Sequence, residues 1–118
     1  MTIAITGGTG FVGQAVLDEA AKRVLDVRAL TRRERYARPG VEWVPGDLAD
    51  FEGLARLMRG AEAAIHIAGA VNAPDEAGFE EANVRGTLRV LEAAKKAGVP
   101  RLIFVSSLAA REPRLSLY

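Results

Sequence analysis

The sequence opens with a short apolar run that leads directly into a cluster of glycines. Residues 2–6 have the character of a strand, a GGTGFVG segment follows at residues 7–13, and an Ala/Leu-rich stretch with helical spacing comes next. A strand that turns sharply into a helix brings unpaired backbone N–H groups and the positive end of the helix dipole to one point. Gly7 would permit the tight turn, Gly10 would let the backbone approach a pyrophosphate, and Gly13 would let the helix pack close to the strand. The pattern predicts a dinucleotide cradle, with a purely structural turn as the alternative.

Further along the chain, apolar runs alternate with helical patterns, which predicts a parallel sheet covered on both faces. Strands are expected at residues 2–6, 26–31, 41–45, 63–68 and 101–106, and helices at residues 11–23, 50–59 and 76–97. Asp50 is the expected N-cap of the second helix, and Gly98 followed by Pro100 would end the third. The prediction is an α/β doubly wound parallel sheet, a Rossmann fold, of about five strands with helices on both faces.

The last residues do not continue this pattern. Residues 108–118 read as loop, because Pro113 interrupts a polar stretch. A doubly wound nucleotide-binding sheet usually has a sixth strand and a further helix. We therefore expect residues 1–118 to be a truncated dinucleotide-binding domain without a C-terminal substrate-binding part. The fifth strand would be an exposed apolar edge, which favours self-association into a homo-oligomer.

Composition excludes several other classes of protein. Sixteen basic and fifteen acidic residues give a formal net charge of +1, which offers no electrostatic case for nucleic acid or a membrane surface. The absence of cysteine and the single His66 argue against a metal site. The chain lacks an apolar stretch of the ~20 residues that a membrane span needs. The expectation is a cytoplasmic domain without a metal.

Five segments together resemble a known family. They are TGGTGFVG at residues 6–13, GDL at 46–48, IHIAG at 65–69, NVRGT at 83–87 and IFVSS at 103–107. In this order they resemble the extended short-chain dehydrogenases/reductases, the NAD-dependent epimerase/dehydratase family, and the likeness extends over nearly the whole chain. The resemblance implies that the glycine segment binds the dinucleotide, and the residues concerned here are Gly7, Thr9, Gly10, Phe11 and Val12.

The end of the second strand bears on the choice of cofactor. An acidic residue there would bind the ribose 2′-hydroxyl and repel a 2′-phosphate, but this chain has Arg32 and Arg33. A guanidinium offers a planar, charged fork to a phosphate. We therefore predict NADP in preference to NAD, with Arg32 as the first candidate and Arg33 as the second. The alternative is that both arginines are solvated in a charged loop.

The resemblance also implies contacts on either side of the pyrophosphate. Asp47 and the backbone of Leu48 would hold the adenine, although Asp47 in a turn after Gly46 is an equally good interpretation of the residues alone. Ala68 and Gly69 would let the backbone run beside the cofactor at the exit of the fourth strand.

Three polar or helix-ending positions invite a structural interpretation. His66 is expected inside the fourth strand, where its side chain would pack against a helix instead of acting as a base. Asn83 is expected in the third helix, where the resemblance implies a structural role beside the active site; the alternative is an ordinary polar helix residue. Many relatives carry a glycine at the end of the first helix, whereas this chain has Arg23-Val-Leu-Asp26, so the helix stop is weaker or shifted.

Catalysis, as the resemblance implies it, depends on the end of the chain. Ser107 matches the catalytic Ser/Thr position, and Tyr118 lies where the tyrosine of a YxxxK motif would fall. The hydroxyl of Ser107 would bind the substrate oxygen and Tyr118 would be the general acid/base. The alternative for Tyr118 is an ordinary loop tyrosine. The expected function is hydride transfer at a secondary alcohol or ketone, on a nucleotide-sugar or another carbonyl substrate, by an oxidoreductase, epimerase or dehydratase.

A second class remains open. Some relatives act as non-catalytic NADP-sensing regulators or structural subunits, and the basic end of the second strand suits them equally well. A lysine four residues after Tyr118 would favour the enzyme. The 118 residues without that lysine are expected to bind dinucleotide weakly and to show no turnover.

Overall fold

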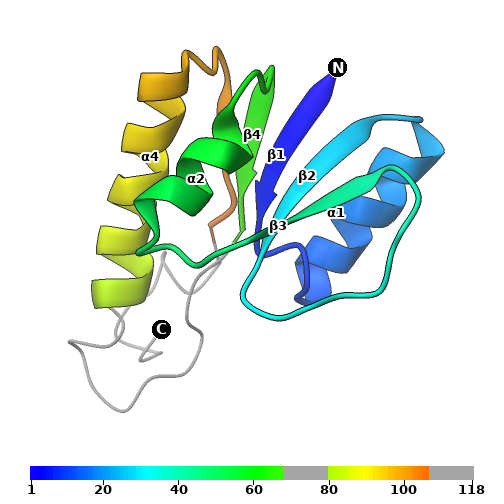
Figure 1. The fold of residues 1–118 in the computed structure, drawn as a ribbon, viewed down its shortest axis with the longest axis horizontal. Coiled ribbons are helices and arrows are strands. Elements are labelled where there is room, and N and C mark those ends of the chain that lie inside the picture. The colour runs from blue at the N-terminus through cyan, green and yellow to red at the C-terminus, as the bar shows by residue number, and fades with distance from the viewer. Residues whose placement is uncertain (68–79, 107–118) are drawn as a thin grey trace.

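The computed structural model describes residues 1–67 and 80–106, and its strands form one parallel sheet (Figure 1). The spatial order is β3-β2-β1-β4-β5. The strands are β1 (Thr2–Thr6), β2 (Asp26–Thr31), β3 (Val41–Pro45), β4 (Ala63–His66) and β5 (Leu102–Phe104). The chain thus starts in the centre of the sheet, extends to one edge, and crosses back over β1 to the other side. This order is the Rossmann topology that the sequence predicted.

Helices cover both faces of the sheet. They are α1 (Phe11–Lys22), α2 (Phe51–Met58), the π-helix η1 (Glu80–Arg85) and α4 (Gly86–Ala97). α2 and α4 lie side by side over one face and α1 over the other (Figure 1). Each layer has its own core, because residues of a strand alternate between the two faces. Leu54, Leu57 and Val90 are buried on the α2/α4 face, and Leu17 with Ile5 on the α1 face.

Local signals in the sequence predict two helix ends correctly. The carboxylate of Asp50 accepts a hydrogen bond from the backbone N–H of Gly53 at 3.0 Å, so it caps α2 as expected. α4 ends at Gly98, whose φ of +71° is the left-handed conformation typical of a helix C-terminus.

The end of α1 shows how the chain stops a helix without a glycine. Val24 takes the left-handed position, with φ of +55°, and its side chain is 90% exposed. The N–H groups of Val24 and Leu25 bond to the carbonyls of Ala21 and Ala20, at 3.1 and 3.0 Å. The helix therefore ends close to where it was predicted, but a β-branched residue adopts a conformation that is unfavourable for it.

Three predicted elements differ from the structure, a helix and two strands. The expected helix over residues 76–97 is, in its described part, a π-helix followed by α4, and the Thr87 hydroxyl donates to the carbonyl of Asn83 near the junction, at 2.8 Å. A hydroxyl that bonds four residues back competes with the regular backbone pattern. The strands β4 and β5 are also shorter than predicted, so Ser106 follows β5 instead of closing it.

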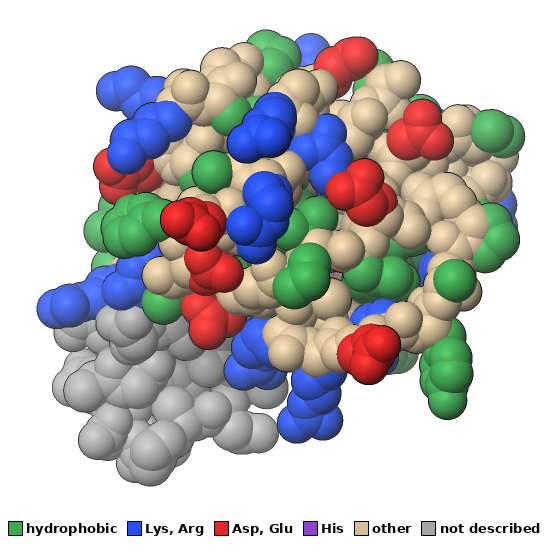
Figure 2. Space-filling model, in the orientation of Figure 1, with side chains coloured by type: hydrophobic (Ala, Val, Ile, Leu, Met, Phe, Trp, Pro, Cys, Tyr) green, Lys and Arg blue, Asp and Glu red, His purple; other side chains and the backbone are tan. Residues whose placement is uncertain are grey.

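β5 forms one edge of the described sheet, as the sequence predicted. Ile103 and Phe104 are 47% and 55% exposed there. Over the face shown in Figure 2, lysine and arginine side chains lie interspersed with acidic ones. In the part of the chain that the structure describes, none of the helices has the length and apolar character of a membrane span.

Candidate dinucleotide-binding site

The carboxyl ends of the strands bring the predicted binding segments together at one edge of the sheet. Because all pairs are parallel, the strands end side by side, with Thr6 beside His66 and Thr31 beside Pro45. The residues that follow the strand ends lie in the same order as the strands across the sheet. They are Asp47 after β3, Arg32 after β2, Gly7 after β1 and Ile67 after β4. Open α/β sheets bind ligands at this edge.

The glycine turn at the centre of this edge has the conformation that the sequence predicted. Gly7 has φ of +76°, a value that favours glycine, and its carbonyl accepts the N–H of Gly10 at 3.2 Å. A Cβ at Gly13 would lie 1.9 Å from the Gly7 carbonyl oxygen and 2.6 Å from the Gly8 Cα. Gly7 and Gly13 are therefore required by the protein's own backbone.

Gly10 is different, because nothing within the protein requires a glycine there. Its φ is −86°, and a Cβ at this position would come no closer than 3.7 Å to another atom of the chain. A side chain would fit the protein but would occupy the open space in front of the turn. This is the expected arrangement where a ligand's pyrophosphate must approach the backbone.

The first turn of α1 supplies hydrogen-bond donors to the same space. Gly10 is the N-cap, and no side chain caps the helix. The first amides of a helix have no partner within it, so those of Phe11 and Val12 are available to an anion at the positive end of the helix dipole. Phe11 is 95% exposed and Val12 46% exposed. These residues fit a pyrophosphate.

The end of β2 presents Arg32 to solvent. The buried Thr31 hydroxyl donates to the carbonyl of Arg33 at 2.6 Å, which tightens the backbone where the strand ends. Among the described residues, the exposed guanidinium of Arg32 has no hydrogen bond or ion pair. It is therefore free to bind an anion beside the glycine turn.

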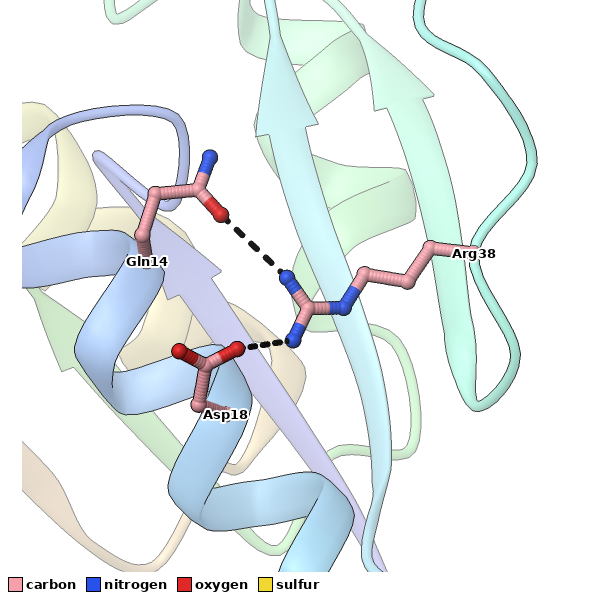
Figure 3. Close-up of polar contacts among 3 residues, drawn as sticks. All are labelled: Gln14, Asp18 and Arg38. Atoms are coloured by element: carbon pink, nitrogen blue, oxygen red, sulfur yellow. Dashed lines mark hydrogen bonds and ion pairs between the residues drawn. The ribbon is translucent and has the colours of Figure 1, made fainter.

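The loop over residues 32–40 is tied to α1 by an arginine that sequence reasoning missed. Arg38 donates to Gln14 Oε1 at 3.2 Å and to Asp18 Oδ1 at 2.6 Å (Figure 3). Its side chain is only 26% exposed. The only signal that distinguishes Arg38 is the polar pair at positions i and i+4 of α1, which presents two acceptors on one helix face.

Asp47 lies in a turn, which is one of the two interpretations that the sequence allowed. Its Oδ1 accepts the backbone N–H of Ala49 at 2.8 Å, and its carbonyl accepts the N–H of Asp50 at 3.1 Å. The side chain is exposed, while Leu48 packs against the α2/α4 core. An adenine contact by Asp47 and Leu48 stays a prediction.

His66 was expected inside a strand over residues 63–68, but β4 ends two residues earlier, so His66 is its last residue. Its side chain is 1% exposed. Its Nδ1 lies 2.6 Å from Thr6 Oγ1, and its Nε2 lies 3.0 Å from Thr87 Oγ1 on α4. Its ring stacks on Phe104 of β5 with centroids 5.6 Å apart. Burial lowers the pKa of His66 below its ordinary value. The expectation that this side chain packs against a helix is confirmed.

Asn83, predicted in a regular helix, belongs instead to η1, where its carbonyl accepts the Thr87 hydroxyl. Four predicted site residues, Ala68, Gly69, Ser107 and Tyr118, lie outside the described residues. Ser106, which precedes Ser107, is exposed after β5.

Comparison with known proteins agrees with this geometry. Residues 3–113 match the NAD dependent epimerase/dehydratase family. Over 98% of its length the chain is 44% identical to a ceramide reductase of Caulobacter vibrioides. A short-chain dehydrogenase/reductase superfamily protein of Agrobacterium tumefaciens, with bound NAD, superimposes with a TM-score of 0.78 at 36% identity over 91% of the chain. The UDP-glucose 4-epimerase of Thermus thermophilus in complex with NAD gives 0.76 at 30% identity, also over 91%.

A parallel sheet in the order β3-β2-β1-β4-β5, with a glycine turn after its central strand, defines a Rossmann-type nucleotide-binding domain. The chain belongs to the NAD dependent epimerase/dehydratase family. It spans 38% of the length of the ceramide reductase, and 33% and 38% of the two solved structures.

Proposed function

We propose that this chain is the dinucleotide-binding part of an NAD(P)-dependent oxidoreductase. The observation that carries the proposal is Gly10. The protein's own packing leaves room for a side chain there, yet the position is open in front of the unpaired amides of α1. Family membership supports the same function.

We further propose that NADP binds in preference to NAD. Arg32 supports this, because its exposed guanidinium follows β2, next to the strand that carries the glycine turn. A 2′-phosphate would gain a charge-assisted hydrogen bond there. The loop's attachment through Arg38 and Asp18 would limit the motion of the backbone that carries Arg32.

The proposed reaction is hydride transfer at a secondary alcohol or ketone. When bound, the nicotinamide group accepts or donates the hydride. Ser107 would hold the substrate oxygen by a hydrogen bond, and Tyr118 would transfer the proton to or from that oxygen. The substrate class that we propose is a nucleotide-sugar or another carbonyl compound, since named relatives include both a reductase and an epimerase.

The experiment is a binding titration of NADP and NAD against the chain and three variants. Gly10→Ala should abolish binding of both nucleotides, because its methyl group meets the pyrophosphate, without a large change in thermal stability. Arg32→Ala should weaken NADP alone, by about tenfold for one lost charge-assisted hydrogen bond. Arg35→Ala, in the same loop, is the matched control and should change neither affinity by much.

Equal affinity for the two nucleotides, or tighter binding of NAD, would contradict the cofactor preference. Unchanged binding by Gly10→Ala would contradict the proposed site itself. Tight binding without turnover on any carbonyl substrate, in the protein with a residue other than lysine four positions after Tyr118, would favour the non-catalytic NADP-sensing role.

A further inference from the structure

His66 connects three parts of the fold at the carboxyl edge of the sheet. Its two ring nitrogens contact the hydroxyls of Thr6, at the end of β1, and Thr87, in the first turn of α4. The sequence separations are 60 and 21 residues. Thr6 immediately precedes Gly7, so the contact reaches the strand end from which the glycine turn starts.

The hydrogen bonds define which ring nitrogen carries the proton. The Thr87 hydroxyl donates to the carbonyl of Asn83, so it can only accept from His66. Nε2 is therefore the protonated nitrogen. Nδ1 of the neutral ring is then an acceptor, and the Thr6 hydroxyl is the donor that lies 2.6 Å away. Burial favours this neutral form.

The same network joins the end of β1 to the exit of β4. The backbone N–H of Ile67 donates to the Thr6 carbonyl at 3.1 Å and lies 3.2 Å from Thr6 Oγ1, to which it also donates. The Thr6 hydroxyl thus accepts from β4 while it donates to His66. Ile67 is the residue through which the chain leaves β4 towards Ala68 and Gly69.

We propose that His66 is a positioning residue of the dinucleotide site. It orients the Thr6 hydroxyl, and through it the start of the glycine turn and the exit of β4, and it attaches both to α4. The inference rests on the proposed function, because it assigns a role within the same site. This positioning role requires Nδ1 of His66 to accept a hydrogen bond. A histidine that only fills space would not need that acceptor.

Two substitutions test the two ring nitrogens of His66 separately. The amide of asparagine stands near the position of Nδ1 and can accept from Thr6, whereas that of glutamine reaches towards the position of Nε2 and can donate to Thr87. We expect His66→Asn to retain wild-type affinity within about twofold, and His66→Gln to lose about fivefold, the value of one hydrogen bond. Affinity is measured by NMR titration with NADP at a temperature where all variants are folded.

A second pair of variants, at Thr6, tests the proposal if the histidine variants do not fold. Thr6→Ser retains the hydroxyl and should bind NADP as the wild type does, whereas Thr6→Val removes it and should lose about fivefold. Nitrogen-15 spectra of the single histidine should show a protonated Nε2 and an unprotonated Nδ1 at pH 7.5.

The outcomes distinguish this role from the proposed function. If the wild-type chain binds neither NADP nor NAD, the proposed function fails and the positioning role fails with it. If the wild type binds and His66→Gln and Thr6→Val bind equally well, only the positioning role is overturned. A protonated Nδ1 in the spectra would also overturn it, since the Thr6 hydroxyl would then not be the donor.

Discussion

Nη2 of Arg38 lies 2.6 Å from Oδ1 of Asp18, so the loop after β2 is attached to the outer face of α1. The same guanidinium also donates to Gln14, one helical turn away on α1. This contact joins α1, which precedes β2 in the sequence, to the loop that follows β2 and begins with Arg32. If Arg32 binds the 2′-phosphate as proposed, Arg38 would contribute to NADP binding through this loop.

Removing the carboxylate of Asp18, one of the two acceptors on α1, should weaken the attachment of the loop. We expect Asp18→Ala to reduce NADP affinity by a few-fold and to lower the free energy of unfolding by less than about 1 kcal/mol, as for other partly exposed ion pairs. Glu19→Ala is the matched control, because Glu19 pairs with Arg23 within the same helix at 2.9 Å. An equal effect of both substitutions on NADP affinity would contradict a specific role of Arg38.

The left-handed residue at the end of α1 offers a stabilising substitution. Val24→Gly removes the steric penalty of a β-branched residue at φ of +55°. We expect about 0.5–1 kcal/mol of stabilisation, since part of the gain is offset by the greater entropy of glycine in the unfolded chain. Urea denaturation measures it. Val24→Ala keeps a Cβ and should give little of this gain, so similar stabilisation by both variants would contradict the explanation.

The close approach at Gly13 predicts a severe loss of stability. A Cβ there meets backbone atoms of Gly7 and Gly8, which cannot rotate away as a flexible side chain would. We expect Gly13→Ala to cost about 3 kcal/mol, the upper end for overpacking. Gly10→Ala, with its nearest atom 3.7 Å away, should cost less than about 1 kcal/mol. Thermal unfolding of the two variants that shows equal losses would contradict this distinction.

The buried histidine predicts how stability depends on pH. Burial lowers the pKa of His66 below 6.5, so at pH values below about 6.5 the unfolded chain binds more protons than the folded one. The unfolding free energy should be highest above that pH and should fall as pH decreases towards the lowered pKa. The slope cannot exceed about 1.4 kcal/mol per pH unit for one proton.

Because the chain has one histidine, a single variant tests this assignment. Urea midpoints measured from pH 7.5 to 5.5 should decrease for the wild type, and the decrease should be smaller in His66→Asn. A variant with the same decrease as the wild type would show that other groups cause it.

The apolar edge strand predicts self-association. Ile103, which is 47% exposed on β5, would be covered in a dimer formed along this edge. The mass from light scattering should rise with concentration, and Ile103→Lys should prevent the rise. Leu88→Lys, at a 58% exposed position on α4, is the control that should still associate. A wild-type chain that is monomeric at all concentrations would contradict the prediction.

The fold follows closely from local features of the sequence. The glycine turn, the cap at Asp50 and the stop at Gly98 each depend on residues a few positions apart, where the conformational preferences of individual residues are strong. The alternation of strands and helices then leaves few topologies to choose from. The candidate cradle could therefore be placed from sequence, because its chemistry resides in the backbone.

Side-chain partners across the fold could not be placed in this way. Thr6 lies 60 residues from His66, and Asp18 lies 20 residues from Arg38. The local pattern can show that Gln14 and Asp18 share one face of α1, but it cannot show that Arg38 is their partner or that Thr6 is the partner of His66. The positive φ at Val24 likewise depends on where the chain must turn to enter β2. Such features arise when strands and helices pack, because packing alone brings distant donors and acceptors to hydrogen-bond distance.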